Sequence, residues 1–305
     1  MEFEIRPKAD YGTITSMKAT ITSFFYDLYN KAFEEDIFSR AAQVAFYFSF
    51  AIFPLLLFLV TLLGFVLGSD NDFRSDLYFY LASIMPISAF ELVKTTIEEI
   101  TESSTGGKLT IGLLVALWSA SAGVDSLRIA LNDVYDFEEK RTWLFTKVIS
   151  VTFTFVLTAL ITFSLGAIFY GWQAISYGFS SIGIEVTSPY LLVSLQWAVT
   201  LVLLIVVFEI LYNVLPCRRP FKWFWITPGS FVGIILWLLL SNGLKTYLYY
   251  WNTYDRFYGS LGAVIILMLW LYLTSLVILI GGMINSILAD IKAAKRIAAA
   301  NEAAS

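Results

Sequence analysis

The stretch LTIGLLVALWSASAGVDSLRIALNDVY, residues 109–135, decides how the rest of the chain is interpreted. It opens with side chains that belong in hydrocarbon, and the same run then carries Asp125, Arg128, Asn132 and Asp133. Charges are costly inside a membrane unless they are paired, reach an interface or line a wet cavity. The stretch is therefore either a helix end that emerges into water or part of a functional site.

The composition indicates an integral membrane protein. Of the 305 residues, 58% are hydrophobic and 14% are charged, which is more apolar than one soluble core requires. The chain has no His, which excludes histidine-based acid/base catalysis and histidine metal sites. The single Cys217 cannot form an intramolecular disulfide. We expect a polytopic protein without a metal ion or another cofactor.

Six segments are long and apolar enough to cross a membrane as helices, which takes about 20 residues each. We place them near residues 41–68, 109–131, 146–171, 190–215, 224–249 and 260–288. No alternation of the β-barrel kind is present, so the fold is predicted to be all-α. Pro54 interrupts the first segment and should kink it.

The spans form one domain, residues 41–288, between a cytoplasmic arm, residues 1–40, and a cytoplasmic tail, residues 289–305. In the arm, apolar side chains recur every three or four positions from 14 to 38, which is typical of an amphipathic helix. This helix either lies on the inner membrane surface or packs beneath the bundle. Residues 69–108, after the first span, carry two helical stripes and are predicted to form two short helices at the outer mouth.

The distribution of basic residues predicts the orientation. Fifteen of the 20 Lys and Arg residues fall on the side of the arm, the second and fourth loops and the tail. Cytoplasmic loops carry this excess, so both termini are predicted in the cytoplasm, with the chain in the inner membrane. With this orientation, the first interpretation of the polar residues from Asp125 to Asp133 is that they cap the cytoplasmic end of the helix. Asp125 and Arg128, three residues apart, form a candidate cytoplasmic gate.

The few polar groups inside or at the ends of the spans are the candidates for a substrate path or gate. With two hydroxyls of the third span, they make up the set Gln43, Asp125, Arg128, Asn132, Thr154, Thr158, Asn242 and Lys245. Arg128 and Glu209 lie toward the cytoplasmic ends of their spans, where snorkelling is a sufficient explanation for each. The same explanation holds for Lys245 on the outer side.

Small and hydroxylated residues recur at spacing four on two spans. They form one ridge at Ser150, Thr154, Thr158, Thr162 and Gly166, and another at Gly229, Gly233, Trp237, Ser241 and Lys245. Such ridges let helix backbones approach and hydroxyls bond across the interface. Hydroxyl ridges would line a wet path equally well, so helix packing and a polar path both stay open.

Other activities are not supported by the residues. The run Gly106–Gly107–Lys108 superficially resembles a phosphate-binding loop, but Glu102 replaces its first glycine and Leu109 its Ser/Thr. We therefore expect no ATP-driven transport by this chain alone. No nucleophile and base pair stands out, so we expect no enzyme. No basic aromatic surface lies outside the membrane, so we expect no nucleic-acid partner.

Several short motifs, in this order, resemble the YihY/BrkB family of bacterial inner-membrane proteins. They are AQVAFY at 42–47, FPL at 53–55, LWSASAG at 117–123, ALN at 130–132, LP at 215–216, RR at 218–219, TPG at 227–229, YGSLGA at 258–263 and LWLYL at 269–273. The resemblance implies six helices with cytoplasmic termini, and functions proposed for the family are export or lipid transport, besides an older ribonuclease label. Relatives often carry acids where this chain has Leu238 and Met283. If those acids couple a proton or cation, this chain lacks that apparatus.

The leading hypothesis is a translocator of a lipid or another amphiphile, with the second, third and fifth spans bordering the path. The rival hypothesis is a non-transporting scaffold or envelope-integrity protein whose polar groups only hold helices together. The rival predicts a tightly packed bundle in which the ridge from Ser150 to Gly166 faces other helices. Membrane lipids are the expected partners, and self-association stays open.

Overall fold

The fold is helical throughout the part of the chain that the structure describes. The computed structural model describes residues 17–67, 75, 78, 79, 94, 106–180, 189–218, 223–250 and 260–304. Within these residues the helices are α1 (Met17–Glu34), α2 (Ile37–Leu67), α5 (Gly106–Val134), α6 (Trp143–Ser180), α7 (Pro189–Val214), α8 (Pro228–Tyr250) and α10 (Ser260–Ala304). The predicted all-α fold is confirmed. The two short helices predicted within 69–108 lie outside the described residues, apart from four isolated positions.

The helices predicted to span the membrane are present as α2, α5, α6, α7, α8 and α10. Long apolar windows lie at Leu114–Val134, Trp143–Phe163, Trp197–Val214, Pro228–Tyr250 and Val264–Asn301, and each is long enough to cross a bilayer. In α2 the described apolar part, Ile37–Ile52, is shorter. The chain is therefore a polytopic membrane protein.

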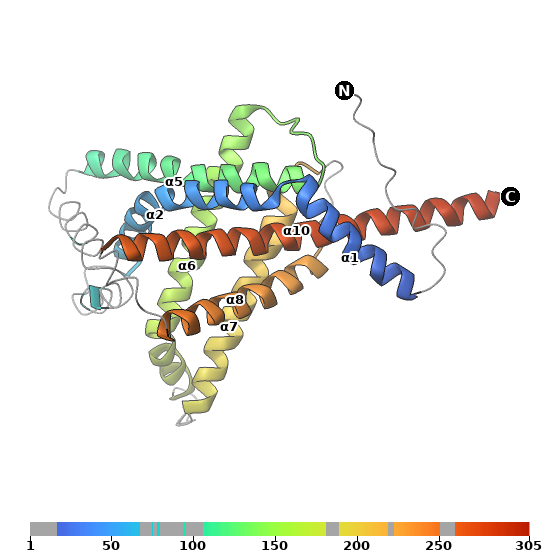
Figure 1. Cartoon of the computed structure of the whole chain (residues 1–305). Helices are drawn as coiled ribbons and strands as arrows, with labels where there is room; N and C mark the ends of the chain where they lie inside the picture. The colour runs from blue at the N-terminus through green and yellow to red at the C-terminus, as the bar shows by residue number, and fades with distance from the viewer. Residues whose placement is uncertain are drawn as a thin grey trace.

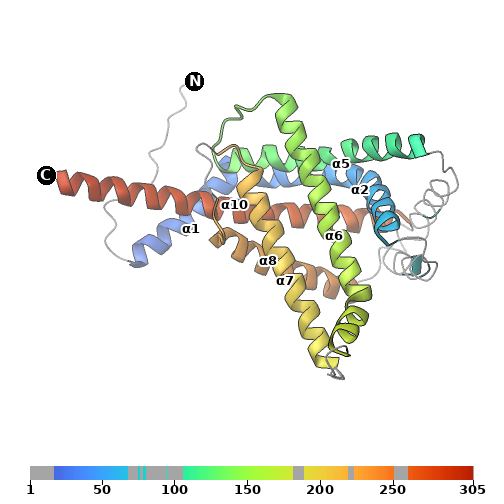
Figure 2. The same cartoon turned by 180° about the vertical axis from the view of Figure 1, so that it is seen from behind.

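Some helix ends differ from the predicted spans. The fifth span was predicted from residue 224, but α8 begins at Pro228 because Thr227 caps it and Pro is tolerated in a first helical turn. The predicted tail, residues 289–305, is not a separate segment, because α10 continues through it as one helix to Ala304. Pro54 lies inside α2, and both views show α2 changing direction along its course, as a proline kink predicts (Figures 1 and 2).

The core lies where α2, α5 and α10 run side by side (Figure 1). Its fully buried side chains are mostly branched aliphatics, including Val44 of α2, Leu127 and Leu131 of α5, and Leu279 of α10. Met283, one of the two positions at which the family resemblance implies an acid in relatives, is 1% exposed and belongs to this core. A carboxylate there would be buried among apolar side chains in this packing.

Glycines bring helix backbones together at one crossing. A Cβ atom added to Gly229 of α8 would lie 2.0 Å from the carbonyl oxygen of Gly281 of α10. A Cβ atom on Gly233 would lie 2.8 Å from the ring of Phe208 in α7. The first half of the predicted small-residue ridge on the fifth span therefore serves helix packing. Further along the same ridge, Lys245 is exposed.

The helices converge at one end of the molecule and diverge at the other. The ends of α5 and α7 and the start of α8 lie near one another in both views, and the first turns of α6 lie beside α5 (Figures 1 and 2). From there α6 and α7 run away from α2, α5 and α10. The converging end carries the polar side chains described next.

Candidate functional site

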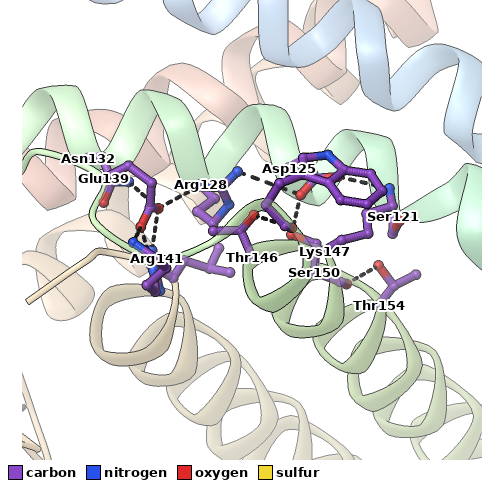
Figure 3. A network of polar contacts seen from close by, with 12 residues as sticks. Ser121, Asp125, Arg128, Asn132, Glu139, Arg141, Thr146, Lys147, Ser150 and Thr154 are labelled. Carbon is purple, nitrogen blue, oxygen red and sulfur yellow. Dashed lines mark hydrogen bonds and ion pairs between the residues drawn. The ribbon is translucent and has the colours of Figure 1, made fainter.

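A network of charged side chains occupies the converging end. We call Asp125, Arg128, Glu139, Arg141 and Lys147 the charged network. Asp125 and Arg128 lie on the last turns of α5, Lys147 lies on the first turns of α6, and the loop between these helices supplies the other two. Figure 3 shows the α5 side chains directed toward the start of α6 and this loop.

Spacing on α5 aligns the polar side chains of the network. Asp125, Arg128 and Asn132 are three and four residues apart, which places them on one face of a helix. The loop after α5 begins with Asp136, whose φ of 56° is a left-handed conformation that Asp tolerates better than most residues. This turn reverses the chain, so that the loop returns along the polar face of α5.

Asp125 bonds mainly to α6. Its carboxylate accepts hydrogen bonds from Lys147 Nζ at 2.9 Å and from Ser150 Oγ at 2.5 Å. The predicted partner, Arg128, is also present, but its NH2 lies 3.8 Å from Asp125 Oδ1. The expected gate pair is therefore the longest of the three contacts, and the α5–α6 contacts are shorter.

Arg128 bonds mainly to the loop. Its NH1 donates to Glu139 Oε2 at 2.6 Å, and its side chain is only 9% exposed. Its Nε is buried without a hydrogen-bond partner among the described residues. Snorkelling into water is therefore not what accommodates this guanidinium. It lies between two carboxylates, Glu139 at short range and Asp125 at longer range.

Glu139 is the acceptor at the centre of the network. Besides Arg128, it accepts from Asn132 Nδ2 at 3.0 Å and from the Nε and NH2 of Arg141, both at 2.7 Å. Burial pushes the pKa of Glu139 upward, but hydrogen bonds and the positive charge from Arg141 outweigh it and hold that pKa at about 2. Glu139 is therefore an anion throughout the physiological range.

The network also holds the end of α7. Arg141 NH2 donates to the carbonyl oxygen of Leu215 at 2.9 Å, and the backbone N–H of Cys217 donates to Asn132 Oδ1 at 2.7 Å. These bonds satisfy one carbonyl and one N–H group of the segment that directly follows α7. Three helix ends are thus joined by one set of polar contacts.

A second polar cluster fixes the start of α8, and we call Glu209, Asn213, Thr227, Ser230 and Asn285 the capping cluster. Glu209 of α7 accepts from the Thr227 backbone N–H at 2.7 Å and from Ser230 Oγ at 2.5 Å. The Gly229 N–H donates to Asn285 Oδ1 of α10 at 2.7 Å. Glu209 is 4% exposed, so its role is to cap a neighbouring helix and snorkelling does not describe it.

The N-terminal helices are tied to the same end. Lys31 of α1 donates to Asp136 Oδ2 at 2.8 Å and to Ser286 Oγ of α10 at 3.0 Å. Arg40 of α2 pairs with Asp133 of α5 at 3.0 Å. The polar residues that follow the apolar half of α5 therefore contact α1, α2, α6 and the segment after α7.

The structure brings together only part of the predicted candidate set. Asp125, Arg128 and Asn132 belong to the charged network. Thr154 and Thr158 are buried on α6, and each donates at 2.8 Å to the carbonyl four residues earlier. The remaining three candidates, Gln43, Asn242 and Lys245, are exposed and lie apart from the network.

Sequence reasoning missed the partners of the network. Arg141 and Lys147 were counted only among the basic residues of the second loop and its helix ends, and Glu139 was not considered. One available signal was the run DFEEKRTWLFTK, in which three acids are followed by three bases directly after the polar face of α5. In the part of the chain that is described, no three Cys, Asp or Glu side chains are grouped to hold a metal ion.

The fold and the charged network define a class: a polytopic α-helical membrane protein whose helices are joined at one end by partly buried ion pairs. Residues 28–305 match the family described as Virulence factor BrkB. The chain belongs to this BrkB family, and the resemblance predicted from its motifs is confirmed.

The chain is similar to several bacterial relatives. The ribonuclease-like protein YfkH of Bacillus subtilis is 29% identical over 266 residues, which cover 87% of this chain and 95% of that protein. The UPF0761 membrane protein IL2447 of Idiomarina loihiensis is 28% identical over 208 residues, which cover 67% of this chain and 69% of that protein. The UPF0761 membrane protein azo3165 of an Azoarcus species is 27% identical over 256 residues, which cover 81% of this chain and 59% of that protein. No solved structure matches.

Proposed function

We propose that this protein moves a lipid or another amphiphile across the bacterial inner membrane, and that the charged network is a gate at the cytoplasmic end. The observation that carries the proposal is the position of Arg128 between two carboxylates on different segments, Glu139 at 2.6 Å and Asp125 at 3.8 Å. A buried guanidinium with a second acid in reach can exchange partners without being left unpaired, which is what a two-state element requires.

The distribution of helices supports the same proposal. The network lies at the end where the spans converge, while α6 and α7 diverge from the others toward the far end (Figure 2). Charged groups within spans are costly and commonly mark substrate or ion pathways. The positive-inside count assigns the converging end to the cytoplasm, so the proposed gate is closed on that side.

The driving force is proposed to come from outside this chain. No phosphate-binding loop is present in the sequence, and Leu238 and Met283 stand at the two positions where the family resemblance implies acids. We therefore propose passive or partner-driven movement, without ATP hydrolysis or proton coupling through those two positions. The ribonuclease-like name belongs to the Bacillus relative, and we propose no enzymatic activity for this chain.

The test is a lipid-movement assay in proteoliposomes with fluorescent lipids of several headgroups. We expect movement faster than in protein-free liposomes for at least one headgroup. Asp125→Asn and Arg128→Gln should abolish this movement while the protein stays folded, because the exchange of partners needs both charges. Lys140→Gln is the control, since Lys140 pairs at the exposed surface with Glu138. Rates equal to empty liposomes for every headgroup would eliminate lipid as the substrate.

A second candidate is a scaffold that maintains the envelope without transport. One observation favours it: the hydroxyls of Thr154, Thr158 and Thr162 are buried and donate to carbonyls of their own helix. In this packing the described part of the ridge faces neighbouring helices. If network variants lower thermal stability and no amphiphile moves, the scaffold is the better description.

A further inference from the structure

An aromatic face remains bare on α1, outside the charged network and the capping cluster. We call Phe25, Tyr26, Tyr29, Phe33 and Phe38 the aromatic face. Each of these side chains is between 43% and 64% exposed. The first four lie on one side of α1 and Phe38 lies at the start of α2. Ring contacts join Tyr29 to Phe33 at 4.8 Å and Phe33 to Phe38 at 5.8 Å.

The opposite side of α1 is already occupied. Phe24, Leu28 and Ala32 pack against the core. Lys31, on the same side, is bound to Asp136 and to Ser286 of α10. The two alternatives left open by the sequence, packing beneath the bundle and lying on a surface, thus apply to different sides of one helix.

The position of α1 in the chain, directly before α2, indicates what the aromatic face contacts. Only Glu35 and Asp36 separate α1 from α2, which begins at Ile37 and enters the membrane. Asp36 has a φ of 48°, so the chain turns sharply here. Both views show α1 crossing α2 and α10 obliquely and not extending either (Figures 1 and 2). With the first span predicted to begin near residue 41, the end of α1 lies close to where the chain enters the membrane.

The aromatic face is also continuous with a lipid-facing surface. Beyond Phe38, α2 exposes Phe46, Tyr47 and Phe50, and in a membrane-spanning helix such side chains face lipid. Tyr and Phe suit the interface, because their rings enter the boundary of the hydrocarbon while a Tyr hydroxyl stays at headgroup level. A bare patch of this size at a water-facing site would be a liability.

We propose that the aromatic face of α1 is a docking surface for the phospholipid bilayer, embedded at the level of the headgroups on the side where α2 begins. The occupant is the host membrane itself. The inference does not rest on the proposed transport, because an interfacial helix would serve a scaffold equally well.

The test uses single-cysteine proteins in a Cys217→Ala background, each labelled with an environment-sensitive fluorophore. Tyr29→Cys places the probe at the middle of the aromatic face. Glu34→Cys is the matched control, because Glu34 is exposed on the same helix but away from that face. The proteins are reconstituted into vesicles of phosphatidylethanolamine and phosphatidylglycerol. Nitroxide-labelled lipids and aqueous iodide are the two quenchers.

We expect the probe at position 29 to emit at shorter wavelength, to lose fluorescence with nitroxide lipid and to resist iodide. The probe at position 34 should show the reverse. Equal iodide quenching at both positions would overturn the proposal. Shielding from both quenchers at position 29, with cross-linking of two Tyr29→Cys chains, would also overturn it and would assign the face to a second copy. If a labelled variant fails to fold, Phe25→Cys supplies the same comparison.

Discussion

Glu139 shows how a single loop residue can link the end of α5 to the segment after α7. It accepts bonds from two arginines and from Asn132, and these donors in turn hold α5 and the segment after α7. Removing its charge leaves Arg128 buried beside one distant acid. The cost of removing one partner from a buried ion pair exceeds the net worth of the pair, because the remaining charge stays desolvated.

We therefore predict that Glu139→Gln lowers the free energy of unfolding by about 2 kcal/mol, less than breaking a fully buried ion pair costs, because the Glu139 side chain is 26% exposed. Glu138→Gln is the control, since Glu138 is exposed and pairs only with Lys140 at 3.4 Å. The control should change stability by less than about 0.5 kcal/mol. Thermal unfolding in detergent, followed by tryptophan fluorescence, measures both. Equal melting temperatures for the two variants would contradict the central role of Glu139.

The same residue predicts a dependence on pH. The pKa of Glu139 falls from an ordinary value of 4.5 to about 2 in the folded protein. A carboxyl group whose pKa is lower in the folded than in the unfolded protein stabilises the fold at any pH above the unfolded-state pKa. This contribution is lost as the pH falls from the unfolded-state pKa toward the folded-state pKa. The stability difference between the native chain and Glu139→Gln should thus be constant above pH 4.5 and shrink below it. Melting curves of both proteins across this range provide the measurement, and a difference that grows on acidification would contradict it.

The residues of the network divide into those that sequence could predict and those it could not. Asp125, Arg128 and Asn132 share a face through helical spacing, which is a local property. Their partners come from the loop and from α6, and which charge meets which depends on how the chain reverses after Val134. Composition and periodicity do not predict how the chain reverses. The sequence therefore indicated only the pair of Asp125 with Arg128 on one helix and missed Glu139.

At the scale of elements, α8 owes its position to a backbone contact. Gly229 lies so close to Gly281 that a methyl group would collide with a carbonyl oxygen at 2.0 Å. Backbone groups cannot move aside as a flexible side chain does. Gly243, on the same helix, has open space within 4 Å of its Cβ position.

We predict that Gly229→Ala costs about 3 kcal/mol or more, at the upper end of overpacking effects. Gly243→Ala, its control on the same helix, should be neutral or stabilising, because Ala favours helix by up to about 1 kcal/mol. The measurement is the temperature at which each detergent-solubilised variant loses its monodisperse elution peak. A stable Gly229→Ala protein would contradict the close crossing of α8 and α10.

Hydropathy predicted the spanning elements because burial in lipid demands long apolar runs. It could not predict where helices continue beyond the membrane. α10 runs through the polar tail to Ala304, and α8 starts later than its apolar signal because Thr227 and the capping cluster fix its first turn. Helix ends are set by caps and tertiary contacts, which leave little trace in mean hydropathy.

At the scale of the whole molecule, the ends of α5 and α7 lie together. The bond from Arg141 to the Leu215 carbonyl joins two loops that the charge count assigned to one side. This contact agrees with the alternation of the spans. Which side faces the cytoplasm stays a prediction from the positive-inside rule.

We predict that a cysteine at Glu138 reacts with a membrane-impermeant thiol reagent in inside-out vesicles and not in intact spheroplasts. Ser75→Cys, at an exposed position of the segment 69–108 that is predicted to lie on the outer side, should react with the opposite preference. Both variants carry Cys217→Ala to remove the native thiol. Labelling yields compared between the two preparations decide the orientation. Reaction of both positions from the same side would contradict the topology itself.

The length of α10 has a mechanical consequence. Its 45 residues form one uninterrupted helix of about 68 Å at 1.5 Å per residue, and its C-terminal end projects past the other helices in both views. When a straight helix of this length changes its tilt by a small angle within the bilayer, its end moves by a large distance. Any tilt of α10 would therefore displace its C-terminal end further than the part of the helix that packs against α2, α5 and α8.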